Sequence, residues 1–352
     1  MALKAPKADP SVKRALLPLE EMAELSPLFR GSLGTGFAKV LKWVFSIDKV
    51  EAFYENICGW DGSVEKGAVG VEFCKRAIEE SGYRMTLNGM PRDEAVDWLR
   101  ENLPAGPFIT VSNHTLGALD GLGLIDLFGS ALGTMPGADS GLGGTGASAA
   151  EPRYKFMVNS LLMRMRAAAS CFISVTPTGA VRTAPTAESI NGVYAAMEHL
   201  RRGGCLGLFP AGAVSNLELG RRPVIEMPDR VGPDEGVIAG LPAVTPGGDR
   251  QSLAEPKVRD REWQMSIVKF IRRAGVPVLP VYNASLNSRF FYSLGLIDWR
   301  LRLTRLPAEL LNKSGRELRF VAGPLITPDQ IASAGSLAEL RALLRSAVYS
   351  LQ

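Results

Sequence analysis

The sequence predicts an α/β fold: a mixed, largely parallel sheet flanked by helices, preceded by an N-terminal helical region. Short apolar runs alternate along the chain with longer segments of helical periodicity, which is typical of strands joined by crossover helices. Polar loops directly follow three of these runs, after Val111, Phe209 and Tyr282. Because functional sites in such sheets gather at the carboxyl ends of the strands, we expect the three loops to share one site.

The first part of the chain is expected to be largely helical. Residues 1–15 are polar and basic and contain prolines, so we predict a flexible tail. Residues 16–102 show mainly helical periodicity and are predicted to pack on, or lead into, the domain that follows. Within them, the apolar residues of 37–45 share one helical face, and such a helix either packs on the core or lies on a membrane. Tyr83 to Leu87 is predicted as a short strand that ends at a turn.

The remaining residues, 103–352, carry the alternating pattern of the sheet. Strands are expected where short apolar runs are bounded by Gly, Pro or polar residues, and helices where apolar residues recur every three or four positions. In chain order we predict strands at 108–111, 154–158, 171–175, 205–209, 276–282 and 317–322, and helices at 116–128, 161–169, 189–202, 263–274 and 337–352.

Two stretches interrupt this pattern. Residues 129–151 are rich in Gly, Ala and Ser, and residues 216–257 are rich in Pro, Gly and charged side chains. Neither composition favours a packed core, so we predict flexible insertions over both ranges. The first insertion is either a mobile cover for the site or a surface loop, because it lies close in sequence to the loop after Val111.

Composition limits the classes of function. The chain has 352 residues, 46% of them hydrophobic and 22% charged, which is ordinary for a globular protein with a large core. Its net charge of +4 is too small to argue for nucleic acid, but it suits an anionic membrane surface or an acidic carrier protein. The four cysteines are scattered, which predicts reduced thiols, a cytoplasmic location and no metal site. Neither a transmembrane run nor a secretory signal is expected.

The loop after Val111 carries the most informative residues. A predicted buried strand leads into Asn113 and His114, and Asp120 follows six residues after the histidine. A histidine at a strand-to-helix turn with a carboxylate nearby is a common way to mount a general base and the group that orients it. The second histidine, His199, lies among apolar and charged residues of a predicted helix, so we expect it to be structural.

Several motifs, taken in order, resemble those of the glycerolipid acyltransferase family, whose members are similar to 1-acylglycerol-3-phosphate acyltransferase. They are Asn113-His114 with Asp120, Phe209-Pro210-Ala211-Gly212-Ala213-Val214-Ser215, and Val278 to Tyr282. Within this family the chain looks closest to a bacterial haemolysin-like and lyso-ornithine-lipid acyltransferase-like branch, which it also matches at 154–159 and 287–292. The resemblance covers roughly residues 35–330 outside the two insertions.

The resemblance implies a peripheral enzyme at the cytoplasmic face of the membrane. It would move a fatty acyl group from acyl-ACP or acyl-CoA to a lysolipid hydroxyl, with residues 103–352 as the acyltransferase domain. His114 would be the general base and Asp120 its orienter, without a covalent enzyme intermediate, cofactor or metal. The other positions implied in substrate binding are Asn113, Gly117, Asn159, Arg182, Pro210, Gly212, Ser215 and Asn287.

The chain departs from the family pattern in two places. Five residues separate His114 from Asp120 where the general motif has four, although the haemolysin-like branch shares the longer gap. Ala211 and Ala213 stand where relatives have glutamate, and Val214 stands where many have arginine. Either Arg182, Arg221 or Arg222 compensates, or the acceptor is a lyso-aminolipid rather than a lysophosphatidate. The alternative is a catalytically inactive relative that binds lipid or a membrane.

Overall fold

The structure is a computed structural model that describes residues 49, 53, 68–137, 150–175, 187–218, 257–297, 302, 305–312 and 314–352. The predicted tail at 1–15, the helix face at 37–45 and the interiors of both predicted insertions lie outside the described residues. Arg182, Arg221 and Arg222 lie outside them as well.

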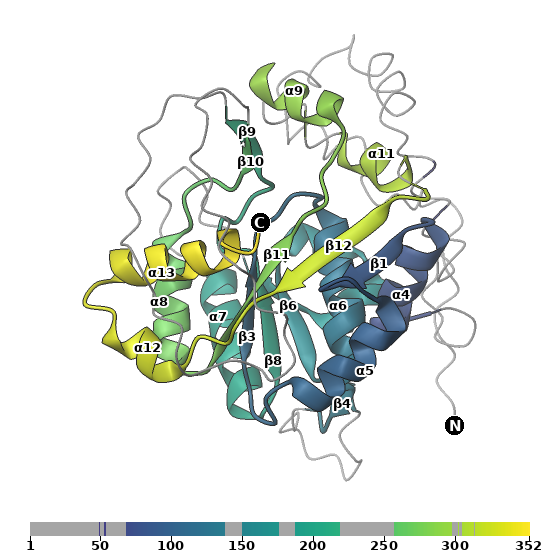
Figure 1. The fold of residues 1–352 in the computed structure, drawn as a ribbon. Coiled ribbons are helices and arrows are strands. Elements are labelled where there is room, and N and C mark those ends of the chain that lie inside the picture. The colour runs from purple at the N-terminus through teal and green to yellow at the C-terminus, as the bar shows by residue number, and fades with distance from the viewer. Residues whose placement is uncertain are drawn as a thin grey trace, which may run out of the picture.

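An eight-stranded sheet forms the centre of the molecule (Figure 1), in the order β2-β1-β12-β11-β3-β8-β6-β7. The five strands from β11 to β7 are parallel, β12 runs antiparallel to β11, β1 runs parallel to β12, and β2 returns antiparallel to β1. The predicted fold class is therefore confirmed. The strands are β1 (Arg84–Leu87), β2 (Met90–Pro91), β3 (Ile109–Ser112), β6 (Tyr154–Asn159), β7 (Phe172–Val175), β8 (Cys205–Leu208), β11 (Val278–Asn283) and β12 (Glu317–Ala322).

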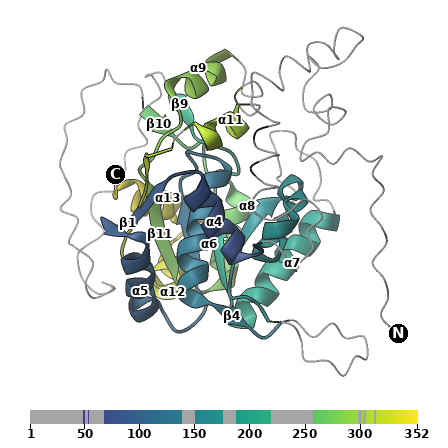
Figure 2. The same ribbon diagram turned by 90° about the vertical axis from the view of Figure 1, so that its right-hand side faces the viewer.

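Helices cover both faces of this sheet. Side chains alternate between the faces of each strand, so Phe108 belongs to one apolar cluster while Ile109 belongs to the other. The α4–α6 group lies on one side, and α8, α12 and α13 lie on the opposite side (Figures 1 and 2). The helices are α4 (Val71–Glu80), α5 (Arg92–Asn102), α6 (Ala118–Leu132), α7 (Ala187–Arg201), α8 (Met265–Ala274), α9 (Arg289–Ile297), α11 (Leu306–Leu311), α12 (Pro328–Ser333) and α13 (Leu337–Tyr349), with 3-10 turns η2 (Ser160–Arg164) and η3 (Arg166–Cys171).

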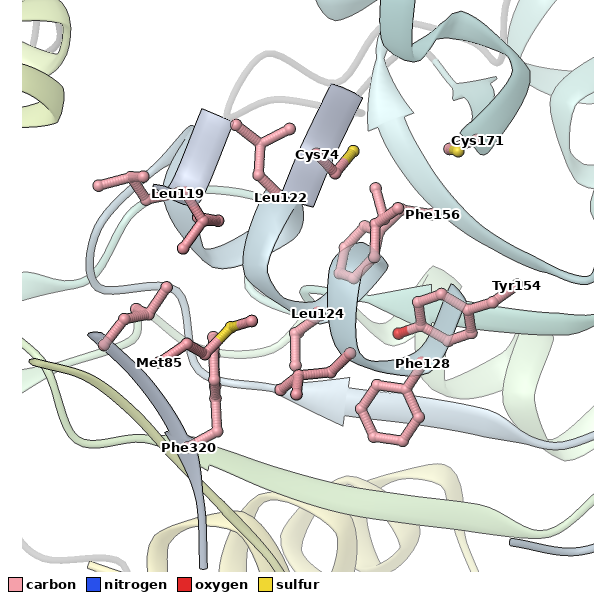
Figure 3. Packing of buried hydrophobic residues seen from close by; sticks show 14 of the residues in the cluster. Cys74, Met85, Leu119, Leu122, Leu124, Phe128, Tyr154, Phe156, Cys171 and Phe320 are labelled. Carbon is pink, nitrogen blue, oxygen red and sulfur yellow. The ribbon is translucent and has the colours of Figure 1, made fainter. Parts of the chain in front are cut away.

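Helix α6 lies within the larger apolar cluster and is buried over most of its length. Figure 3 shows its leucines and Phe128 among side chains from β1, β6, β12 and α4. Gly123 permits this packing, because a Cβ at that position would lie 2.9 Å from side-chain atoms of Leu318 and Phe320. The buried carboxylate of Asp126 is neutralised by Arg92, whose guanidinium lies 2.5 Å away. The helix is thus held on several sides, which makes it a rigid support for residues in its first turn.

The predicted boundary at residue 102 does not separate two structural units. The strand predicted at 83–87 forms β1, and its partner is β12, far along the chain. Helix α4 packs against α6, and α5 packs against both α6 and β1. Residues 68–102 therefore extend the main sheet and its helical layer, because β1 and the apolar sides of these helices are buried only there.

Both predicted insertions begin and end in regular structure. Helix α6 continues to Leu132, and β4 (Thr134–Met135) then pairs with β5 (Glu151–Pro152). Likewise, β9 (Asn216–Glu218) pairs with β10 (Lys257–Arg259). The prediction of flexible chain was wrong at these ends. Ladder hydrogen bonds between the two ends of each segment are long-range pairings, which local composition does not reveal.

Candidate active site

The structure brings the three predicted loops together at one edge of the sheet. Strand β3 lies between β11 and β8 and is parallel to both, so all three strands end at the same edge. The Ser215 backbone N–H donates to the His114 carbonyl at 2.6 Å, which joins the loop after β8 to the loop after β3. The Asn113 side chain donates to the Asn283 carbonyl at 3.0 Å, which joins the latter loop to the end of β11.

His114 and Asp120 form a hydrogen-bonded pair. Nδ1 of the imidazole lies 2.8 Å from Oδ2 of the carboxylate. Gly117 makes the pair possible despite the five-residue gap, because its φ of 78° reverses the chain just before α6 begins. A side chain at Gly117 would also collide with Leu306, whose Cδ2 would lie 2.7 Å from the added Cβ. The role of Gly117 is therefore in the turn that presents the carboxylate to the imidazole.

Asp120 is completely buried, and three further hydrogen bonds hold its carboxylate. The backbone N–H of Leu116 donates to it at 2.9 Å, with a second contact at 3.1 Å, and Nδ2 of Asn283 donates to Oδ1 at 2.6 Å. Because an ionised carboxylate only accepts, this arrangement assigns the proton on the imidazole to Nδ1. No described residue forms a hydrogen bond with Nε2, and the His114 side chain remains 17% exposed. The lone pair on Nε2 is thus open to a substrate proton.

The imidazole is also held by stacking. The ring of Phe209, at the end of β8, lies 3.9 Å from the His114 ring between centroids and is inclined by 17°. Phe209 in turn contacts Phe156 of β6, with their ring centroids 4.6 Å apart. The imidazole is consequently held by an aromatic side chain on one side and by a carboxylate at Nδ1, and both contacts limit its rotation.

A second buried carboxylate, that of Asp260, fixes the backbone on the other side of His114. It accepts from His114 N–H at 3.1 Å, from the Ser215 hydroxyl at 2.5 Å and from Trp263 Nε1–H at 3.0 Å. Burial raises the pKa of Asp260, while these three hydrogen bonds act to lower it. Asp260 therefore joins the loops after β3 and β8. It stands just beyond a predicted insertion, and nothing in its local sequence indicated this role.

Two residues predicted to bind substrate have structural roles. Asn113 is buried and forms a reciprocal pair with Asn283, whose backbone N–H donates to Asn113 Oδ1 at 2.7 Å. Asn287 is buried and donates to the carbonyl of Thr115 at 3.0 Å, as does the hydroxyl of Tyr292 at 3.1 Å. Both amides thus form hydrogen bonds with backbone groups that join the loops, and their predicted contact with substrate stays a prediction.

The loop after β8 also differs from expectation. Ser215 is fully buried, and its hydroxyl contacts the His114 carbonyl at 2.9 Å as well as Asp260, so it does not face an acceptor. Pro210 is buried, and its carbonyl accepts from Gln264 N–H at 2.9 Å. Gly212, with a φ of 64°, makes room for the same glutamine, since a Cβ there would lie 2.0 Å from Gln264 Nε2. All three residues shape this loop.

Arg302 supplies a buried positive charge beneath this loop. Its guanidinium donates to the carbonyls of Val214 at 2.9 Å and Ser215 at 2.7 Å. Burial lowers its pKa to about 10. Among the described residues predicted to bind substrate, Asn159 is exposed at the end of β6, and β8 separates β6 from β3. The structure does not bring Asn159 into the His114 network.

Two further features of the described residues bear on the class of site. They contain no group of three or more His, Cys, Asp or Glu side chains placed to hold a metal ion. In the same part of the chain, no helix combines the length and the apolar character required to cross a bilayer.

Comparison with known proteins bears on the chemistry of this site. A lyso-glycine lipid O-acyltransferase from Phocaeicola vulgatus is 21% identical over 318 residues, which cover 88% of this chain and 86% of that protein. The chain resembles lipid acyltransferases. This similarity confirms the resemblance expected from the motifs. The crystal structure of a 1-acyl-sn-glycerophosphate acyltransferase from Thermotoga maritima aligns with a TM-score of 0.37 at 12% identity, covering 94% of this chain and 92% of that one. No family model matches the chain.

Proposed function

We propose that the protein is a membrane-associated acyltransferase that moves a fatty acyl group from acyl-ACP or acyl-CoA to the hydroxyl of a lysolipid. The observation that carries this proposal is the His114–Asp120 pair, in which Nδ1 is bonded to a buried carboxylate while Nε2 is open. A base with this arrangement is suited to deprotonating a hydroxyl at neutral pH.

The proposed reaction needs only one transfer step. Nε2 of His114 takes the proton from the acceptor hydroxyl as its oxygen attacks the thioester carbonyl. The tetrahedral intermediate then collapses, the carbon–sulfur bond breaks, and the thiolate takes the proton from the imidazolium. Asp120 stabilises the imidazolium between these events because its carboxylate contacts Nδ1–H at 2.8 Å. The acceptor hydroxyl is the nucleophile, so no side chain of the protein has to form a bond with the acyl group.

We further propose a lyso-aminolipid as the acceptor. The loop after β8 carries Ala211, Ala213 and Val214 where relatives have charged residues, so it lacks the side chains expected to hold a glycerol phosphate. The similar protein from Phocaeicola vulgatus is named for a lyso-glycine lipid, which is an acceptor of this kind. The proposed location is the cytoplasmic face of the membrane, where the net charge of +4 would favour anionic lipids.

The proposal is tested by thiol release from acyl-CoA and from acyl-ACP. Purified protein is supplied with lyso-ornithine lipid, lyso-glycine lipid or lysophosphatidate, alongside His114→Ala as the matched control. We expect release that depends on the lyso-aminolipid and is lost in the variant. If wild type and variant behave alike with every acceptor, the catalytic assignment is wrong and a lipid-binding relative is the better account.

A further inference from the structure

Large apolar side chains are exposed on helix α9 and just before it. Phe290 is 53% exposed and Leu296 is 50% exposed, and Leu286, just before the helix, is 46% exposed. We call these three residues the α9 outer face. Single exposed apolar residues are common on proteins, but several large ones on one short element mark a surface that contacts something other than water.

Among the described residues, a different side of α9 makes the packing contacts of this helix. The opposite side of the helix already contributes Phe291 and Tyr292 to a buried cluster with Val214. Leu217 of β9, Val258 of β10 and Leu306 of α11 pack against the same cluster. The exposed part of the helix combines the polar Arg289 and Ser293 with the apolar Phe290 and Leu296. A surface helix normally exposes mainly polar residues, so the two large apolar side chains stand out there.

The position of α9 relates this face to the base. Asn287 and Tyr292 both donate hydrogen bonds to the carbonyl of Thr115, the residue that follows His114. Figures 1 and 2 show α9 with β9, β10 and α11 at the end of the molecule toward which β11 runs. The face therefore lies at the edge of the sheet that carries His114.

Positive charges border the α9 outer face. Arg289 is exposed next to Phe290, and the guanidinium of Arg305 lies 5.4 Å from the centroid of the Phe290 ring. The buried carboxylate of Glu309 accepts from the Ser288 hydroxyl at 2.6 Å and lies 3.5 Å from Nε of Arg305. Arg305 is therefore paired, and the exposed cation beside Phe290 is Arg289. Exposed apolar side chains beside an exposed arginine match the chemistry of an anionic lipid surface, where the apolar groups enter the acyl region and the cation meets the headgroups.

We propose that the α9 outer face docks on the surface of an anionic lipid bilayer and so presents a membrane-embedded acceptor to His114. The presentation of the acceptor rests on the proposed acyltransferase function, whereas the docking itself does not. Docking requires no reaction and can be measured on its own, so the two proposals can fail separately.

The test is co-sedimentation with vesicles of phosphatidylglycerol and phosphatidylcholine, compared with vesicles of phosphatidylcholine alone. The double variant Phe290→Ser/Leu296→Ser should bind the anionic vesicles at least about tenfold more weakly than wild type, because two large apolar side chains are lost. Tyr194→Ser is the control, since Tyr194 is 67% exposed on α7, a helix that packs on the edge strand β7. It should bind as wild type does. Thermal melts should show that both variants are folded.

A second arm separates docking from catalysis. His114→Ala should sediment with anionic vesicles as wild type does, whether or not the wild type shows turnover. If turnover occurs, the double variant should lower the ratio of turnover on vesicle-borne lysolipid to turnover on a short-chain monomeric lysolipid. Undiminished vesicle binding by the double variant would overturn the proposal. Light scattering gives a second outcome that would overturn it. If the wild type is a dimer, and the double variant is a monomer that still binds vesicles as the wild type does, the face binds a second copy of the chain.

Discussion

The two histidines of this chain have the same side chain but contrasting surroundings. His114 lies at a strand end with Nδ1 bonded to a carboxylate and its ring partly exposed. His199 lies inside α7, is 4% exposed, and its Nε2 is 3.1 Å from the carbonyl of Arg153. Burial lowers the pKa of His199 to about 4. A general base needs one nitrogen held by an anion and the other open to substrate, and only His114 of the pair meets both conditions.

The largest expected effect separates the two histidines directly. His114→Gln should lower kcat/KM by about 10²–10⁴-fold, because the proton acceptor for the substrate hydroxyl is lost. His199→Gln should leave kcat/KM close to the wild-type value, since its ring contacts backbone inside a helical layer. Steady-state thiol release for the two variants makes the measurement. Equal losses of kcat/KM in the two variants would contradict the assignment of the general base to His114.

The next effect concerns the carboxylate that orients the base. Asp120→Asn should lower kcat by about 10²-fold or more, because an amide neither stabilises the imidazolium nor holds the Nδ1–H tautomer. Asp126→Asn is the matched control, since Asp126 is buried in the same helix but is paired with Arg92. We expect it to lower the melting temperature and to keep kcat near wild type. If Asp126→Asn loses as much kcat as Asp120→Asn at temperatures where it is still folded, the effect of Asp120→Asn comes from the stability of α6 and not from its contact with His114.

The third effect is on stability in acid. His199 has a folded-state pKa of about 4, whereas an unfolded histidine titrates near 6.5. Between these values the unfolded state binds the additional proton, so the free energy of unfolding falls as pH is lowered from about 6.5 to about 4. The loss attributable to this group is at most about 3 kcal/mol. Urea titrations at pH 7 and pH 4.5 should show a smaller acid loss for His199→Gln than for wild type.

The smallest effect should come from Asp260, which positions His114 through the backbone. Asp260→Asn should lower kcat about tenfold, because the amide can still accept from His114 N–H but cannot satisfy every donor that the carboxylate binds. The raised pKa gives a further readout. Asp260 keeps its carboxyl proton to a higher pH in the folded state than in the unfolded state. The free energy of unfolding of the wild type therefore falls as pH rises from the unfolded pKa of Asp260 to its folded pKa. The asparagine variant should lack this component; an unchanged pH profile would contradict the assignment.

The sequence allowed much of the sheet to be predicted. Strand and helix periods are local, so the strands at 108–111, 205–209 and 276–282 were located to within about two residues. The pairing of His114 with Asp120 was also accessible, because both residues belong to one strand-to-helix turn. The α9 helix was not predicted, because its first residues continue directly from the polar loop that follows Tyr282.

The partners of the pair could not be predicted in the same way. Asp260 is 146 positions from His114, and Asn283 is 163 positions from Asp120. Neither has a local pattern that indicates a role, because each acts only once distant strands are side by side. The same limitation explains why Asn113 and Ser215 were predicted to face substrate. A polar residue beside a base looks available until the fold shows which backbone groups it satisfies.

The reciprocal hydrogen bonds of Asn113 and Asn283 also bear on the synthesis of the protein. These amides close a loop of 170 positions, and the carboxylate that orients His114 receives a hydrogen bond from the same Asn283. A nascent chain emerging from the ribosome can build β3 and α6 well before β11 has been synthesised. Long-range closure of this kind is slow to form. The His114–Asp120 pair therefore receives its Asn283 hydrogen bond only after 163 further residues have been synthesised, when the part of the sheet around β3 closes.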